Sequence, residues 1–368
     1  MEYSKKLDSA IIKATNIFNE KNGVENKVRT VHRALGEAGC YRDIYSNNGS
    51  ADPEKLYALM HALVTRLSPG VSASIMVMIN TILPVLLKHA NQTSKNVSDG
   101  MLDGTLVAAF AVTEPAGGSF VFDVLNTNCE KISSGYRIDG EKRYITNGHF
   151  ADVLLVLAKS AQNKNKWTNC SLFAIPGSLP GITRSELAKH GLIDSPISSI
   201  RFDNLIVPHE LCIAHNSGAI DIFNAISKER SIIGVASLIV AEAAILLLKK
   251  SLDSEVLTNV SQSRVALSNE WLELLLGRVS YLNSYRNIAM EDQEKALVSS
   301  ISKYKLAKGA EDIIGKVWEI AQALPLKSDV IRVLDSFHKD SKVFQIFAGT
   351  SDVMLDLIFD LTKTLKPM

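Results

Sequence analysis

The segment Ala111–Ser119 reads AVTEPAGGS, and Tyr144–Gly148, further along the chain, reads YITNG. The first segment runs from a strand-like stretch into a glycine-rich turn that presents Thr113, Ser119 and backbone N–H groups. Glycines permit close approach of the backbone to a ligand, and clustered N–H groups suit a phosphate or a polar ring edge. Because Gly-Gly turns after strands are common, the first segment alone does not identify a site; the order and spacing of both segments carry the pattern.

Short β-rich runs surround these two segments. They read TLVAAFAVT (105–113), DVLLVLAKS (152–160), SLFAI (171–175) and SIRFDNLIV (199–207), and turn-prone clusters such as Ser133-Ser134-Gly135 separate them. Strands at this spacing are typical of a compact sheet or barrel.

Helical patterns lie on both sides of the β-rich region. Asp52–Arg66 repeats apolar residues at i, i+3 and i+4, with Asp52 and Pro53 suited to an N-cap and first turn, and the chain is amphipathic from Gly218 almost to its end. The sequence therefore predicts an α+β fold with three domains: helical 1–104, β 105–215 and helical 216–368.

The charge balance excludes several functional classes. With 40 basic and 39 acidic residues, there is no electrostatic case for nucleic acid or for an anionic membrane surface. The four cysteines are widely separated and the eight histidines show no ligand spacing, so we expect reduced thiols, no metal site and a cytoplasmic protein without a secretory signal.

One apolar stretch, Ser231–Leu248, approaches the length of a membrane span. Glu242 lies inside it, and a carboxylate in mid-membrane costs about 2.5–3.5 kcal/mol on insertion scales. We therefore expect a helix buried within a helical domain and no membrane span.

TEP-x-G-G-S followed by Y-I-T-N-G resembles the signature of the acyl-CoA dehydrogenase family. The resemblance continues through KHGL at 189–192, FDN at 202–204 and KDSKVFQIFAGTS at 339–351. It covers about residues 100 to 360 in order, and the first hundred residues match mainly in helical character. It implies N-terminal helices, a middle β domain and a C-terminal four-helix bundle.

The resemblance also implies FAD between the β domain and the bundle, completed by a second protomer in a homodimer or homotetramer. The first segment would line the flavin, and Thr146 would lie near its N5. The implied cofactor-binding residues are Phe110, Val112, Thr113, Ser119, Tyr144, Ile145, Thr146, Thr350 and Asp352.

The family needs a carboxylate base, which in many members is a Glu directly before the last Gly-Thr. Here that position is Ala348, and the sequence instead resembles isovaleryl-CoA dehydrogenase-like members, whose base lies in a Glu-Arg pair on the first C-terminal helix. Glu229-Arg230 occupies that place. Because Ala225, Ile226, Ile232 and Ile233 would surround Glu229 on its helix face, we expect a raised pKa suited to a general base. The alternative is a Glu at the edge of the apolar face, in solvent or paired with a Lys.

Loss of the side chain at Ala348 leaves its backbone N–H, which the resemblance assigns to the thioester oxygen. Such donors are worth about 2.7–4 kcal/mol each in oxyanion sites. Ser119, Arg230 and Gly349 are the implied substrate-binding residues.

Three departures from the family pattern concern nucleotide binding. The Arg and Phe of an R-x-x-F-G motif that grips the flavin pyrophosphate are replaced by Ser251 and Ser254, for which Lys249 and Lys250 could only partly substitute. A Gly-Gly-x-Gly turn near the adenine is replaced by QALPLK at 322–327, and an Asp that helps to grip coenzyme A is replaced by Ser227.

We therefore predict α,β-dehydrogenation of an acyl thioester, either acyl-CoA or an acyl or aminoacyl group on a carrier protein. Electron-transfer flavoprotein or oxygen would be the electron acceptor. Two alternatives stay open: a partner subunit without activity of its own that lacks or shares a flavin, and a flavin oxidase or N-oxygenase on the same fold.

Overall fold

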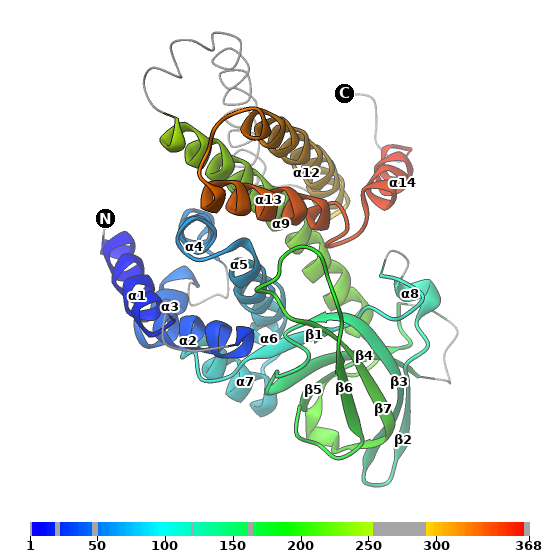
Figure 1. Ribbon diagram of the computed structural model, residues 1–368. Coiled ribbons are helices and arrows are strands. Elements are labelled where there is room, and N and C mark those ends of the chain that lie inside the picture. The colour runs from blue at the N-terminus through cyan, green and yellow to red at the C-terminus, as the bar shows by residue number, and fades with distance from the viewer. Residues whose placement is uncertain are drawn as a thin grey trace. The chain divides into compact units, whose positions relative to one another are not determined.

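The computed structural model describes residues 2–18, 23–45, 51–118, 121–160, 165, 167–252 and 292–363. The chain forms two compact units (Figure 1). The first consists of Met1–Ala188 and Ile193–Ile226, and the second of Lys189–Leu192 and Ser227–Met368. The predicted N-terminal helical domain and most of the predicted β domain thus lie in the same unit.

The N-terminal part of the first unit is helical. Its elements are α1 (Glu2–Phe18), α2 (Val24–Glu37), α3 (Cys40–Ile44), α4 (Pro53–Arg66), α5 (Pro69–Met76), η1 (Val77–Ile82), α6 (Leu83–Lys88) and α7 (Gln92–Leu102). The predicted helix over Asp52–Arg66 is confirmed, because Asp52 caps α4 by accepting hydrogen bonds from the N–H groups of Glu54 and Lys55. Ser68 caps α5 in the same way.

The second part of the first unit is a mixed sheet. Its strands are β1 (Ala108–Ala111), β2 (Asn128–Ile132), β3 (Gly135–Thr146), β4 (Val153–Ser160), β5 (Cys170–Pro176), β6 (Ile182–Glu186), β7 (Ile197–Val207) and β8 (Cys212–Ala214). The order is β6-β7-β3-β2-β4-β5-β8, with β1 paired in parallel to β4. Two short helices, α8 (Val121–Val124) and η2 (His209–Leu211), complete it. Apolar side chains of these strands form one buried cluster, which includes Ile138, Leu154, Phe173 and Phe202.

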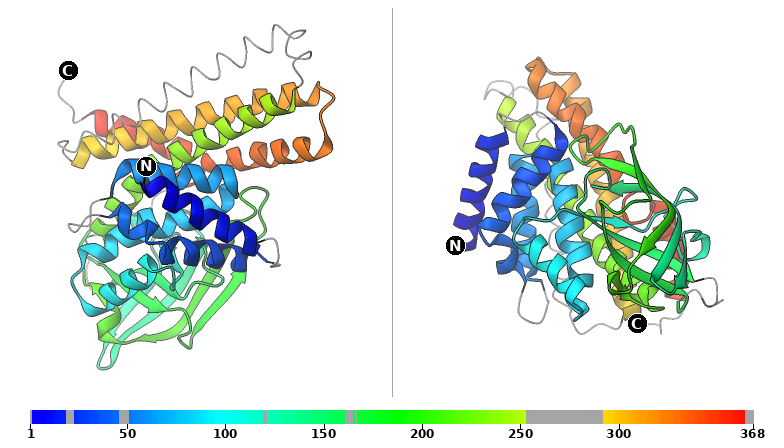
Figure 2. Two further views of the ribbon diagram at one scale, coloured as in Figure 1. Left: turned by 90° about the vertical axis from the view of Figure 1, so that its left-hand side faces the viewer. Right: turned by 90° about the horizontal axis from the view of Figure 1, so that it is seen from below.

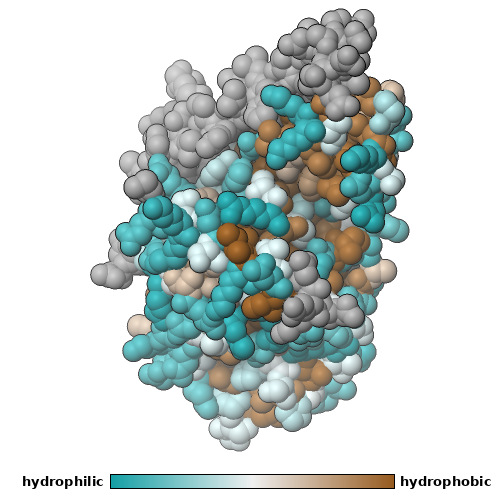
Figure 3. Space-filling view, turned by 60° about the vertical axis from the view of Figure 1, so that its left-hand side comes forward, coloured by the Kyte–Doolittle hydropathy of each residue, from teal (hydrophilic) through white to brown (hydrophobic). Residues whose placement is uncertain are grey.

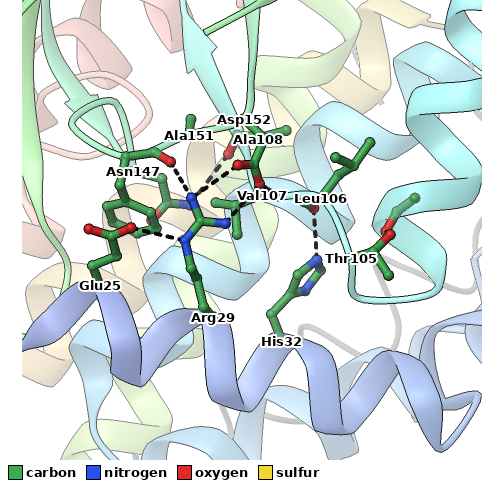
Figure 4. Close-up of polar contacts among 12 residues, drawn as sticks. Glu25, Arg29, His32, Thr105, Leu106, Val107, Ala108, Asn147, Ala151 and Asp152 are labelled. Atoms are coloured by element: carbon green, nitrogen blue, oxygen red, sulfur yellow. Dashed lines mark hydrogen bonds and ion pairs between the residues drawn. The ribbon is translucent and has the colours of Figure 1, made fainter. Parts of the chain in front are cut away.

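Two polar side chains of α2 hold the helices against the sheet (Figure 4). Arg29 donates to both carboxylate oxygens of Asp152 at 2.8 and 3.1 Å, and Asp152 also accepts from the Val107 N–H at 2.8 Å. His32 Nε2 lies 3.0 Å from the Leu106 carbonyl oxygen. The ends of β1 and β4 are therefore fixed to α2 on the side where the helices pack.

The second unit is helical. Helix α9 (Gly218–Ser251) begins in the first unit and continues into the second. The other helices of the second unit, within the described residues, are α12 (Asp292–Gln322), α13 (Ser328–Phe344) and α14 (Ser351–Thr362). Figure 2 shows α12 alongside α9 and α13. The approach to α9 is close, since a Cβ on Gly234 would lie 3.3 Å from Leu306 and Lys303 of α12.

Two helical stretches, Pro69–Lys88 and Gly218–Ser251, have the length and apolar composition of a membrane span. Within their most apolar windows 83% and 72% of the residues are buried, so both are core helices. The face drawn in Figure 3 is largely hydrophilic, with apolar residues gathered in separate areas. Cys40, Cys129, Cys170 and Cys212 are free thiols.

Candidate functional site

The turn after β1 is organised by a buried ion pair. Glu114 accepts hydrogen bonds from the N–H groups of Asn126 and Thr127, and Lys142 Nζ on β3 lies 2.8 Å from its Oε1. Lys142 also donates to the Val112 carbonyl at 3.2 Å. Burial alone would raise the pKa of Glu114, but Lys142 and the N–H donors lower it below its usual value. The predicted glycine-rich segment is therefore fixed to β3 by Glu114.

The YITNG segment ends β3 with an irregular backbone. The pairing of β3 with β7 shifts between Lys142 and Ile145, and Tyr144 and Asn147 have φ of 61° and 64°. Asn147 Nδ2 donates to the Ser74 carbonyl at 3.0 Å. A Cβ on Gly148 would lie 2.5 Å from Ser198 Oγ, so a larger residue there would require Ser198 to move. The Asn and Gly of this segment thus set the backbone path.

The two predicted threonines lie on these joined segments. The Arg143 N–H donates to the Thr113 carbonyl at 2.8 Å, which ties the turn to the end of β3. Thr146 is 5% exposed, and within the described ranges neither the Thr113 nor the Thr146 hydroxyl has a hydrogen-bond partner in the protein. Two unused hydroxyls beside a glycine turn fit the polar edge of a flavin ring.

The other predicted cofactor residues differ in their surroundings. Val112 and Ile145 are buried, Phe110 is partly buried in β1, and Tyr144 is 54% exposed. In the second unit Thr350 caps α14 by accepting from the Val353 N–H, and Asp352 is exposed on that helix. Ser119 lies outside the described residues.

Glu229 and Arg230 are buried near the start of the second unit, with 9% and 8% exposure. Burial raises the pKa of the Glu229 carboxyl to about 7, and the neighbouring Arg230 charge limits the rise. This agrees with the direction expected from the apolar helix face. A carboxyl group that is half ionised near neutral pH can accept a proton and release it again.

Arg230 contacts the turn that precedes α14. Its Nε donates to the Ala348 carbonyl at 3.2 Å, and its Nη1 is buried without a partner. Arg230, the residue after the predicted base, therefore contacts the predicted oxyanion residue.

Ala348 lies in a turn between α13 and α14. Its φ is 56°, and Gly349 follows with φ of 101°. A left-handed residue other than glycine, asparagine or aspartate costs of order 1–2 kcal/mol, so the surroundings must hold this turn. In the described part of the chain no acceptor binds the Ala348 N–H, which is therefore available to a ligand.

Lys303 of α12 contacts the same turn and was not among the residues predicted from the sequence. Its side chain is fully buried, and its Nζ donates to the Gln345 carbonyl at 3.0 Å in the same turn. Burial lowers the pKa of Lys303 to about 8, and the Arg230 charge adds to the effect. The available signal was a lysine spaced three and four residues before Leu306 and Ala307, on the apolar face of its helix.

The KHGL motif also has a structural position in the second unit. The Leu192 N–H donates to Asp340 on α13 at 2.6 Å. A Cβ on Gly191 would lie 2.7 Å from the Lys339 carbonyl oxygen, so the backbone at Gly191 packs directly against the backbone of α13.

The described residues fit the ring end of a flavin better than its ADP end. Ser251 is turned onto its own helix, where its hydroxyl donates to the Leu247 carbonyl at 2.8 Å. Helix α12 ends at Gln322, and the Leu326 N–H closes a tight turn on the Leu324 carbonyl. Ser254 lies outside the described residues. No glycine-rich phosphate cradle is present in the described stretch 292–363.

Comparisons with known proteins agree with this architecture. Residues 109–205 match the family model "Acyl-CoA dehydrogenase, middle domain". The chain is 26% identical over 281 residues to probable medium-chain specific acyl-CoA dehydrogenase 2, mitochondrial, of Caenorhabditis briggsae, covering 74% of this chain and 67% of that protein. It is 33% identical over 154 residues to mitochondrial isovaleryl-CoA dehydrogenase of Oryza sativa subsp. japonica, covering 40% of this chain and 36% of that protein.

Solved structures share the whole fold. Butyryl-CoA dehydrogenase from Megasphaera elsdenii superposes with a TM-score of 0.84 at 17% identity, covering 98% of this chain and 97% of that one. A glutaryl-CoA dehydrogenase from Mycobacterium smegmatis in complex with FADH2 gives 0.82 at 17% identity, covering 100% and 95%. The α+β fold class and the resemblance inferred from the two sequence segments are confirmed: the chain has the acyl-CoA dehydrogenase fold and is related to that family.

Proposed function

We propose that this protein is an FAD-dependent oxidoreductase that introduces a double bond between the α and β carbons of an acyl thioester. The observation that carries the proposal is Glu229, a buried carboxyl group whose pKa is raised to about 7. The next residue, Arg230, contacts the turn that presents the Ala348 N–H. Removal of a proton from the α carbon of a thioester requires these groups: a base that accepts the proton and a hydrogen-bond donor that stabilises the developing negative charge.

Glu229 takes the α proton in this mechanism. The electron pair of the broken α C–H bond forms the new C=C bond as the β hydrogen departs with its own pair. FAD, when bound, supplies the acceptor for that hydride. The product is an enoyl thioester, and Glu229 is left protonated until solvent removes its proton.

The Ala348 N–H stabilises the negative charge that develops on the thioester oxygen. It belongs to a turn whose Ala348 carbonyl is held by Arg230, so the donor is fixed before the substrate binds. Preorganised donors of this kind are worth about 2.7–4 kcal/mol each. Gly349, at the end of the same turn, borders the thioester. Arg230 and Ser119 border it as well.

The cofactor-binding residues are those of the two sequence segments together with the start of α14. Thr113 and Thr146 supply hydroxyls to the flavin ring, and Phe110, Val112, Tyr144 and Ile145 line it. Ser119, Thr350 and Asp352 complete the set. The unused hydroxyls of Thr113 and Thr146 support this assignment.

The carrier of the acyl group is either coenzyme A or an acyl carrier protein. Relatives of this type hold an Asp that grips coenzyme A where this chain has Ser227. This difference weakens the case for free acyl-CoA, because an acyl group on a carrier protein needs fewer nucleotide contacts. We further propose a cytoplasmic homodimer or homotetramer, organised as the domains 1–104, 105–215 and 216–368. Electron-transfer flavoprotein or oxygen would reoxidise the flavin.

The first experiment is the visible spectrum of the purified protein, with the cofactor released and identified. A flavin band that yields FAD, and bleaches anaerobically with an acyl thioester, supports the proposal. A colourless protein that cannot be reconstituted with FAD contradicts it and favours a partner subunit. Rapid reoxidation by oxygen with a hydroxylated product favours the oxygenase alternative.

The role of Glu229 is tested by Glu229→Gln, with the exposed Glu319→Gln as the matched control. The first variant should keep FAD bound, and its rate of flavin reduction by the thioester should fall by about 10²–10⁴-fold, the usual contribution of a general base. Retention of more than about a tenth of the rate would sink the assignment of Glu229.

A further inference from the structure

Lys303 is fully buried in the second unit, yet it has no carboxylate partner among the described residues. Its Nζ binds one acceptor, the Gln345 carbonyl oxygen at 3.0 Å. Lysine is almost never fully buried unless it is paired, because removal of an ammonium group from water is costly. An apolar side chain would fill this position without the cost of removing a charge from water. We therefore look for another role for the contact with Gln345.

The Gln345 carbonyl is where the turn begins. It accepts from Lys303 Nζ and also from the Ser351 N–H at 3.0 Å, so it joins α12, the end of α13 and the start of α14. The Ser351 hydroxyl also contacts the Gln345 side chain. The turn therefore closes on one carbonyl oxygen.

The Ala348 carbonyl is where the turn ends, and Arg230 Nε donates to it at 3.2 Å. Two buried cations from two helices thus hold the two ends of residues 345–348. Between them Ala348 has a left-handed backbone and an N–H without an acceptor in the described chain. Hydrogen bonds from charged donors are about twice as strong as neutral ones, which suits them to hold a strained turn.

We infer that Lys303 is a positioning residue: with Arg230 it holds the 345–348 turn in the conformation that presents the Ala348 N–H. This inference rests on the proposed function for its effect on rate, but its effect on the turn does not depend on any substrate. Lys303 touches neither thioester nor flavin in this role. It acts through the backbone of Gln345.

The test compares Lys303→Met with Lys308→Met, a variant of an exposed lysine on the same helix whose ion pairs lie on the surface. Lys303→Met should reduce the rate of anaerobic flavin reduction at saturating thioester by about 10- to 100-fold, the loss expected when a preorganised donor is misplaced. Flavin content and the half-saturating thioester concentration should stay within about twofold. Lys308→Met should match the wild type.

A second readout needs neither flavin nor substrate. Amide hydrogen exchange, followed by mass spectrometry of the peptide that contains Ser351, reports the Ser351 N–H bond to Gln345. Lys303→Met should speed that exchange at least about tenfold while exchange in the rest of α12 is unchanged. Since a buried charge is removed, its unfolding midpoint should equal or exceed that of the wild type. Lys303→Leu is the second variant should Lys303→Met not accumulate.

The outcomes separate the two proposals. Unchanged Ser351 exchange overturns the inference about Lys303, as does a reduction rate within about threefold of wild type. A wild-type protein that oxidises no thioester overturns the proposed function only, and the exchange result then decides the role of Lys303. Loss of rate together with a lowered unfolding midpoint and faster exchange throughout α12 would show a general structural role and also overturn the inference.

Discussion

Lys142 and Glu114 form an ion pair in which both side chains are almost completely buried, at 0% and 2% exposure, with 2.8 Å between Nζ and Oε1. Burial lowers the pKa of Lys142 to about 8, and Glu114 opposes that change, so both groups are charged near neutral pH. The pair connects the turn after β1 to β3, the two segments by which the sequence resembles the acyl-CoA dehydrogenase family. The Glu of TEP therefore has a structural use.

Replacing only one member of this ion pair with an uncharged residue should destabilise the protein strongly. Lys142→Met leaves a buried carboxylate and should cost about 3–5 kcal/mol, measured by urea unfolding. The double variant Glu114→Gln with Lys142→Met should cost clearly less than the sum of the single variants, because no unpaired charge remains. The exposed pair of Lys13 and Glu37 is the control, and Lys13→Met should change stability by at most about 1 kcal/mol. A loss below about 1 kcal/mol for Lys142→Met would contradict this account of the pair.

The strands that could be predicted from the sequence are the buried ones. β4 and β5 have continuous apolar runs, and their predicted spans agree with Val153–Ser160 and Cys170–Pro176. β6 (Ile182–Glu186) reads ITRSE and is mostly exposed, so no apolar run marks it. It forms because every residue of β6 pairs with a residue of β7. Such pairing comes from tertiary contacts, which a local pattern does not contain.

The candidate site was partly predictable for the same reason. The resemblance points to Glu229 through the Glu229-Arg230 pair and Ala348. Its burial agrees with the apolar neighbours that surround it at helical spacing. Lys303 was missed because its role depends on the Gln345 carbonyl, a contact between residues far apart in the chain. Likewise, neither TEP nor the strand sequence GEKRYIT indicates that Glu114 and Lys142 meet. Long-range polar contacts between backbone and side chain have no periodic signature.

The raised pKa of Glu229 should appear as a dependence of stability on pH. Its folded-state pKa of about 7 lies above the ordinary value of 4.5, so the folded state binds more protons in that window and stability falls as pH rises through it. Glu229→Gln removes the titration. Relative to wild type, the variant should therefore gain roughly 2–3 kcal/mol between about pH 5 and about pH 8, at 1.36 kcal/mol per pKa unit. Urea unfolding at both pH values measures this.

The exposed Glu319→Gln variant serves as the control for Glu229→Gln, and its stability relative to wild type should be nearly the same at both pH values. A Glu229→Gln variant that behaves like this control would show that Glu229 ionises in the folded protein as it does in solvent. That result would also count against Glu229 as a base tuned to neutral pH.

His32 on α2 should make the protein sensitive to acid. Its ring is fully buried between the Tyr41 hydroxyl and the Leu106 carbonyl, each 3.0 Å away. The carbonyl can only accept, so Nε2 carries the proton and Nδ1 accepts from Tyr41. Burial lowers the pKa of His32 from 6.5 to about 4. The neutral ring therefore contributes stability that is fully present above about pH 6.5 and is lost as pH falls towards 4.

His32→Gln should be less stable than wild type at pH 7 by about 1–3 kcal/mol, the cost of a buried polar group left without its partner. The difference should shrink as the pH falls from about 6.5 to about 4.5, because only the wild type loses stability by protonation of a buried imidazole. Chemical unfolding at several pH values, with His149→Gln as an exposed control, measures both curves. Parallel curves for His32→Gln and wild type would mean that His32 titrates normally. Its two hydrogen bonds would then not hold the neutral ring between α2, Tyr41 and the strand end at Leu106.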